Sequence, residues 1–245
     1  GDVGTYSSMA IDSNNKMHIS YLDATNGDLK HAVNTVIKVC PSTDTCIIFP
    51  SGAESPDGGE VVPSGSTYTI QWAAPSDVVT FDLEYSMNNG LTWNVIATGV
   101  SGTSYNWAVP IPKKNKKNCL MKVIGYDASD NLVAEDISDS TFTIEVVKVT
   151  SPNGGETLKM GSIYRIYWIT NMTIRPVAKV NLLYTTNWGT TWNLIRSLVG
   201  NPGSHPWSVP VKVNPKKAKI EVVLKDAAGK IIGTDVSDHV FIISP

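Results

Sequence analysis

The stretch EYSMNNGLTWNVI, from Glu84 to Ile96, returns 99 residues later as LYTTNWGTTWNLI, from Leu183 to Ile195. Both copies place strand-forming residues on each side of a short polar segment that contains Asn and Gly. Such a segment between two runs of aliphatic, β-branched or aromatic residues is typical of a β-hairpin. The repeated stretch therefore predicts the same hairpin twice, and with it a β-rich fold.

Every residue in the hairpin has a structural explanation. Gly90 and Gly189 supply the positive φ that a tight turn needs, and the short amides of Asn88 and Asn187 can hydrogen-bond to the turn backbone. Trp93 can bury a large ring against its own hairpin or the core. None of these residues is a nucleophile, an acid or a base, so we interpret the hairpins as structural.

The order Ser/Thr-x-Asn-x-Gly-x-Thr-Trp in both copies resembles the Asp box of sialidase-type propellers and other β-proteins, with Asn where Asp is usual. The resemblance implies a hairpin that marks the fold and lies away from catalysis.

The repeat extends well beyond the hairpins. SPDGGE (55–60) returns as SPNGGE (151–156), and DISDSTFTI (136–144) returns as DVSDHVFII (235–243). Three pairs of tryptophans also match, at 72 and 168, 93 and 192, and 107 and 207. The offset grows by three residues between the first two pairs, so the second copy has a longer loop there. Duplication of one ancestral unit of roughly a hundred residues explains these matches.

Each unit has the pattern of a β-sandwich. TYTIQW (67–72) and YRIYW (164–168) alternate large apolar residues with polar ones, and turn signals recur at short intervals. Many short strands in a unit of this length predict an antiparallel sandwich. We therefore predict an all-β chain with two tandem Ig-like β-sandwiches, over 40–147 and 148–245, preceded by a short β-meander over 1–39.

Several separated motifs of the unit resemble a known domain. The order SPNGGE, I-x-W, Y-x-W-x-VP and D-x-SD-x-x-F-x-I is similar to the Ig-like domain named for the yeast cell-wall synthesis proteins. The resemblance covers about residues 47–245, twice over. It implies an Ig-like sandwich in an extracellular multidomain protein and brings no catalytic residue with it.

The segment before the repeats predicts three strands over 7–34, with turns at DSNNK and DATNGD. It resembles one repeat of bacterial β-propeller proteins, but a propeller needs several blades to close. Two interpretations stay open: the chain is a fragment that begins in a last blade, or the meander pairs with the next unit or a neighbouring subunit. Open strand edges favour strand addition, which would make the protein a subunit of an assembly or filament.

Composition excludes several classes of partner. Hydrophobic residues make up 42% of the 245 residues, enough for two cores, and the net charge of −2 gives no electrostatic case for nucleic acid. The sequence contains no run of eighteen apolar residues, so it does not predict a segment that inserts into a membrane. The first residues are not a signal peptide, so we expect either a removed signal or a fragment of a longer chain. No catalytic or cofactor motif is present, so we predict a non-enzyme without cofactors.

The cysteines are few. Cys40 and Cys46 could close a small disulfide ring, which would imply an oxidising compartment and agree with an extracellular or cell-surface location. Cys119 is then left over as a thiol in a strand.

Two further patterns are candidate binding residues. Asp136, Asp139, Asp235 and Asp238 are weak calcium candidates, because hard cations favour clustered carboxylates; the competing interpretation is that they cap the turn before the last strand. We predict no metal site. The lysine-rich segments 112–118 and 214–219 are interpreted as charges that protect a sheet edge rather than as a polyanion site.

Trp188 is the tryptophan without a partner in the other copy, where Asn89 stands at the tip of the turn. An exposed ring at a turn tip can stack on sugars or fill a partner's pocket. Trp188, with Tyr184 or Trp192, is therefore the candidate carbohydrate site, and packing on a neighbouring domain or loop is the alternative. Asn171-Met172-Thr173 forms a glycosylation sequon.

These observations predict a non-catalytic extracellular structural or adhesion module, with protein partners or self-assembly through the N-terminal segment. The alternatives are a carbohydrate-binding module, or spacer domains of a larger secreted enzyme.

Overall fold

The structure is a computed structural model, and it describes residues 3–11, 17–23, 28–34, 47, 49, 56–211 and 216–245. Every regular element in these ranges is a β-strand, so the predicted all-β class is confirmed. The same residues contain no helix of the length and hydrophobicity that a membrane crossing requires.

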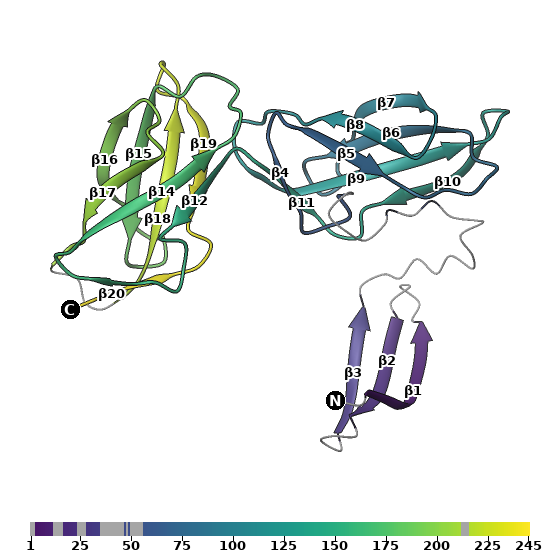
Figure 1. The fold of residues 1–245 in the computed structure, drawn as a ribbon, viewed down its shortest axis with the longest axis horizontal. Helices are drawn as coiled ribbons and strands as arrows, with labels where there is room; N and C mark the ends of the chain where they lie inside the picture. Colours follow the sequence, from purple (N-terminus) through teal and green to yellow (C-terminus); the bar gives the residue numbers. More distant parts are fainter. Residues whose placement is uncertain are drawn as a thin grey trace.

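The N-terminal strands form a sheet of their own. β1 (Val3–Ile11), β2 (Met17–Asp23) and β3 (Asp28–Asn34) pair antiparallel in the order β1-β2-β3. Neither outer strand pairs with any other strand that the structure describes. The segment is therefore a β-meander with two open edges (Figure 1).

The first sandwich is built from the next eight strands. They are β4 (Val61–Pro63), β5 (Thr67–Gln71), β6 (Thr80–Ser86), β7 (Asn94–Val100), β8 (Ser104–Ala108), β9 (Lys116–Tyr126), β10 (Leu132–Ile137) and β11 (Phe142–Glu145). The larger sheet has the order β4-β11-β9-β6-β7, with β10 on β9, and the smaller sheet pairs β5 with β8. All pairings are antiparallel except that of β4 with β11.

The second sandwich repeats the strand order of the larger sheet and adds β12 to the smaller one. Its strands are β12 (Val147–Ser151), β13 (Thr157–Lys159), β14 (Ile163–Thr170), β15 (Lys179–Thr185), β16 (Asn193–Val199), β17 (Ser204–Ser208), β18 (Lys216–Lys225), β19 (Ile231–Val236) and β20 (Phe241–Ser244). The larger sheet has the order β13-β20-β18-β15-β16, with β19 on β18, and the smaller one has the order β12-β14-β17. The predicted tandem sandwiches are thus present, each with its own pair of sheets (Figure 1).

Each sandwich has its own aromatic core between its sheets. In the second sandwich the Trp207 ring centroid lies 5.3 Å from that of Tyr184 and 6.3 Å from that of Phe241. The equivalent distances in the first sandwich are 5.2 and 6.2 Å, from the Trp107 ring to the rings of Tyr85 and Phe142. The duplication therefore preserves side-chain packing as well as strand order.

The interpretation of the lysine-rich segments as protection for a sheet edge stays a prediction. These segments lead into β9 and β18, whose pairing with β6 and β15 begins only at Leu120 and Lys219. Lys116 is paired with Ile144 of β11, and Lys217 with Ile242 of β20. The first of these segments also lies where the two sandwiches meet, because its Asn115 bonds Val146 and Val147.

Candidate functional site

The first hairpin closes through one asparagine. Asn88 Oδ1 accepts hydrogen bonds from Ser86 Oγ at 2.9 Å and from the Thr92 N–H at 3.0 Å, and its Nδ2 donates to Thr92 Oγ1 at 2.9 Å. The Gly90 N–H donates to Ser86 Oγ at 2.9 Å, and Gly90 has φ +81°. Asn88 thus replaces the backbone partners that the turn residues lack.

The second hairpin repeats the network bond for bond. Asn187 Oδ1 accepts from Thr185 Oγ1 at 2.8 Å and from the Thr191 N–H at 2.9 Å, and Asn187 Nδ2 donates to Thr191 Oγ1 at 2.9 Å. The Gly189 N–H donates to Thr185 Oγ1 at 3.1 Å, and Gly189 has φ +87°. These side chains all hydrogen-bond within the turn.

We expect Asn88→Ala to lower the free energy of unfolding of the first sandwich by about 1–2 kcal/mol, because the turn loses several side-chain hydrogen bonds at once. Leu91→Ala, in the same turn, is the matched control, since Leu91 is 83% exposed. Urea unfolding followed by tryptophan fluorescence measures both. Equal stability of the two variants would show that the asparagine network does not hold the hairpin.

The three aromatic residues predicted as a carbohydrate site each have a different neighbour. Trp192 covers its own turn, because a Cβ built on Gly189 would lie 3.6 Å from the Trp192 ring. Tyr184 packs on the buried Trp207. Trp188 is 67% exposed at the turn tip, and Lys217 Nζ lies 5.2 Å from its ring centroid. Trp188 is thus the accessible ring of the three.

Trp188 and Asn89 share an unusual backbone conformation. Trp188 has φ +61° and Asn89 has φ +57°. Asn tolerates this left-handed region better than an aromatic residue does. The tryptophan therefore stands where the turn itself favours a smaller residue.

The predicted calcium candidates have hydrogen-bonding roles in the fold. Asp136 Oδ2 accepts from the Phe49 N–H at 3.0 Å, and Asp235 Oδ2 accepts from the Val149 N–H at 2.8 Å. Asp238 donates its N–H to Asn153 Oδ1 at 2.7 Å. Among the described residues, no group of three His, Cys, Asp or Glu is arranged to hold a metal ion.

Asp139 makes the corresponding contact in the first sandwich, where its N–H donates to Asp57 Oδ1 at 3.0 Å. Cys119 is fully buried in β9, and its thiol donates to the Lys116 carbonyl at 3.3 Å. Burial raises the pKa of the Cys119 thiol to about 11, so it is protonated and unreactive at neutral pH. Cys40 and Cys46 lie outside the described residues.

The two sandwiches are joined without a free linker. Only the buried Val146 separates the end of β11 from the start of β12. Asn115 Oδ1 accepts from the N–H groups of Val146 and Val147 at 2.7 and 3.1 Å. Asn115 Nδ2 donates to the Val147 carbonyl at 2.8 Å and lies 3.4 Å from Asp235 Oδ1. One side chain of the first sandwich thus pairs with the connecting backbone and reaches the second sandwich.

The longer loop of the second copy supplies the other half of this junction. The Asn171 N–H donates to the Val146 carbonyl at 2.8 Å, and Asn171 Nδ2 donates to the Glu145 carbonyl at 2.9 Å. The Met172 N–H donates to the Ser64 carbonyl at 3.3 Å, and Ser64 Oγ donates to the Met172 carbonyl at 2.5 Å. We call this set, Ser64, Asn115, Glu145–Val147, Asn171 and Met172, the junction clamp.

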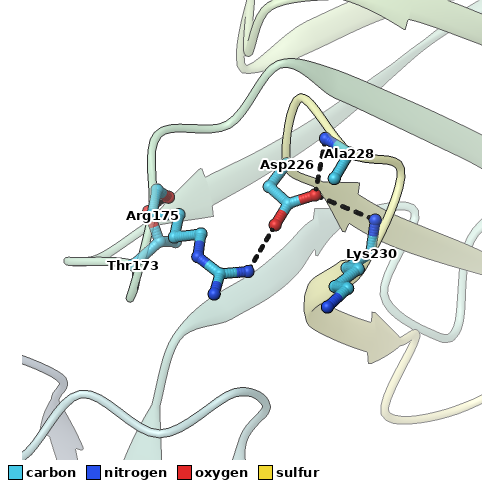
Figure 2. Close-up of polar contacts among 5 residues, drawn as sticks. All are labelled: Thr173, Arg175, Asp226, Ala228 and Lys230. Atoms are coloured by element: carbon cyan, nitrogen blue, oxygen red, sulfur yellow. Dashed lines mark hydrogen bonds and ion pairs between the residues drawn. The ribbon is translucent and has the colours of Figure 1, made fainter.

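The loop is also tied to its own sandwich (Figure 2). Thr173 Oγ1 donates to the Arg175 carbonyl at 2.7 Å, and Arg175 Nη1 pairs with Asp226 Oδ2 at 2.8 Å. Asp226 Oδ1 accepts from the Ala228 and Lys230 N–H groups at 3.0 and 2.9 Å. The hydrogen bond from Arg175 lowers the pKa of Asp226. The loop is therefore bonded to both sandwiches.

The clamp also engages the glycosylation sequon. Asn171 Nδ2, the atom to which a glycan would be attached, donates to the carbonyl of Glu145 and lies 3.3 Å from its Oε1. Sequence reasoning did not identify Asn115, Ser64 or Glu145 as functional residues. The available signal was the growth of the repeat offset by three residues, which falls in the loop that carries Asn171.

Burial raises the pKa of Glu145, and Lys148 and the Asn171 side chain oppose the shift. A raised carboxyl pKa favours the folded state at low pH, and this stabilisation is lost as pH rises through the folded-state pKa. We expect Glu145→Gln to be more stable than wild type at neutral pH. The difference in free energy of unfolding should vanish as pH falls toward 4.5, the ordinary pKa of a glutamate carboxyl. Urea unfolding at several pH values measures it, and a pH-independent difference would contradict the assignment.

No protein-family model matches the chain, and no curated protein matches its sequence. Among solved structures, fibronectin(III)-like modules of Clostridium thermocellum CbhA match at 15% identity and a TM-score of 0.30, over 80% of this chain and 92% of that one. Chicken CNTN1 FN1-FN3 domains match at 10% identity and a TM-score of 0.28, over 94% of this chain and 78% of that one. Titin domains A168-A170 match at 11% identity and a TM-score of 0.25, over 99% of this chain and 82% of that one.

Proposed function

We propose that this protein is a non-catalytic extracellular structural module, in which two Ig-like sandwiches form a stiff arm that carries the N-terminal meander. The junction clamp is the observation that supports this proposal. The resemblance to the yeast cell-wall synthesis family, inferred from the sequence motifs, agrees with it.

The physical argument concerns stiffness. Flexible linkers let neighbouring domains move independently, and domain motion is the default where few contacts cross a boundary. Here a single residue connects the strands, and polar contacts to Asn115, Asn171 and Ser64 cross the boundary. Such a connection suits a spacer that must hold what it carries at a set distance and direction.

The meander is the part that we propose for assembly. The outer edges of β1 and β3 are unpaired with any other described strand, and unpaired edges are templates for strand addition by another chain. A second copy of the chain, or a surface protein with a complementary edge, would complete the sheet.

Sedimentation velocity and negative-stain electron microscopy of the whole chain test this proposal. We expect oligomers or filaments at micromolar concentration, and a monomer after deletion of residues 1–39. A chain that stays monomeric at all concentrations, or that assembles equally well without residues 1–39, would argue against assembly through the meander.

The exposed Trp188 favours carbohydrate binding as a second candidate function. Stacking on a sugar would use the open ring face at the turn tip. A glycan array with wild type and Trp188→Ala distinguishes a structural module from a carbohydrate-binding module. Glycan binding that the substitution abolishes supports the carbohydrate-binding module.

A further inference from the structure

An open groove of about 570 Å³ lies in the second sandwich between β16 and β17, the edge strands of its two sheets. Its lining includes Tyr184, Leu194, Arg196, His205 and Pro206. The volume is in the range of sites that hold a small ligand or a few sugar units. The groove is separate from the junction clamp, because none of its lining residues belongs to that set.

The charge at the groove is positive. Arg196 lines it, and Arg165, which is outside the lining on the neighbouring β14, donates from Nη1 to Ser204 Oγ at 3.3 Å. His205 also lines the groove, but burial and the charges of Arg196 and Arg165 lower the pKa of His205, so its imidazole is neutral at neutral pH and adds no positive charge. None of the described residues that line the groove is Asp or Glu. The site therefore favours an anionic ligand.

The first sandwich lacks these three side chains. At the positions equivalent to Arg196, His205 and Arg165, the first copy has Ala97, Tyr105 and Thr69. The two copies share strand order and core packing, so the fold does not require these side chains. Their presence in the second copy alone indicates a role other than folding.

Both strands that flank the groove are poor partners for an added strand. The register of β16 against β15 shifts at Ile195, which leaves a bulge in the edge strand. Pro206 in β17 has no N–H to donate. Bulges and prolines are devices that keep edge strands from pairing with other chains. A ligand here must be recognised by side chains rather than by backbone pairing, which favours a glycan over an extended peptide.

We propose that this groove binds an acidic polysaccharide of the uronic-acid class. The guanidinium groups of Arg196 and Arg165 would pair with ring carboxylates, since arginine matches carboxylate geometry with two parallel donors. Tyr184 and Leu194 would contact the apolar face of a sugar ring. The site does not depend on the structural role proposed above.

Isothermal titration calorimetry of the whole chain with an oligogalacturonate tests the proposal. Arg196→Ala and Arg165→Ala are each expected to weaken binding about tenfold or more, because each removes a charged hydrogen bond. Lys230→Ala is the matched control, since it removes one exposed positive charge far along the chain on the β18–β19 turn and should leave affinity unchanged. Circular dichroism checks that all three variants fold.

Two further ligands test whether binding depends on the charge of the ligand, on its sugar rings, or on both. A neutral cello-oligosaccharide of the same length should bind weakly, and an oligoglutamate peptide of equal charge should bind no better than the neutral sugar. Absence of oligogalacturonate binding by wild type, an equal loss in Lys230→Ala, or tighter binding of the peptide would each overturn the proposal.

Discussion

Trp207→Ala is expected to lower the free energy of unfolding of the second sandwich by about 3–5 kcal/mol, the range for removing a large aromatic side chain from a core. Trp207 is 4% exposed and contacts the rings of Tyr184 and Phe241. Its removal leaves a cavity between the two sheets and breaks both ring contacts. Since many domains have a total stability of about 5–15 kcal/mol, this loss should be large enough to unfold the domain at moderate temperature.

Differential scanning calorimetry and urea unfolding measure this effect. Trp188→Ala is the control, because it removes the same side chain from an exposed position. We expect only the transition of the second sandwich to shift, since Trp107 and Trp207 belong to separate cores. A shift of the same size in Trp188→Ala would mean that Trp207 does not carry the core packing described here.

Asn115→Ala is expected to loosen the connection between the sandwiches and to lower the free energy of unfolding by about 2–4 kcal/mol. The substitution leaves the N–H groups of Val146 and Val147 and the Val147 carbonyl without the partners that Asn115 provides. A buried polar group without a partner costs about 1–3 kcal/mol, and water entering the boundary would recover part of that cost.

Small-angle X-ray scattering and limited proteolysis measure the loosening. We expect a broader distribution of particle dimensions and faster cleavage near Val146 in the variant. Lys114→Ala, at the preceding exposed residue, should behave as wild type. A variant with unchanged scattering and unchanged stability would show that Asn115 does not hold the sandwiches together.

The architecture was predictable because the burial pattern of each strand follows from the alternation of apolar and polar residues within that strand. In TYTIQW the buried Ile70 and Trp72 alternate with polar residues, and the structure places the aromatic residues where that period requires. The duplication strengthened the prediction, because two divergent copies with the same tryptophans and glycines have to satisfy one fold.

The junction clamp could not be predicted from the sequence because its contacts join distant residues. Asn115 sits among lysines in a segment that reads as an ordinary polar loop, and its partners lie more than thirty residues further along the chain. Nothing in the local pattern states that a carbonyl or N–H group will need that amide. The groove of the second sandwich is similar, because Arg196 and His205 line it from two different strands and come together only after the sheets form.

The single-residue connection through Val146 has a consequence for exchanging these domains between proteins. Domains are usually separated at the linker, but here hydrogen bonds cross the boundary from both sides: Asn115 donates to the Val147 carbonyl, Asn171 to the Glu145 carbonyl, and Ser64 to the Met172 carbonyl. A sandwich transplanted alone would leave its neighbour with orphaned donors and acceptors. The smallest portable unit of this chain is accordingly the pair, and a chimera should be spliced outside it.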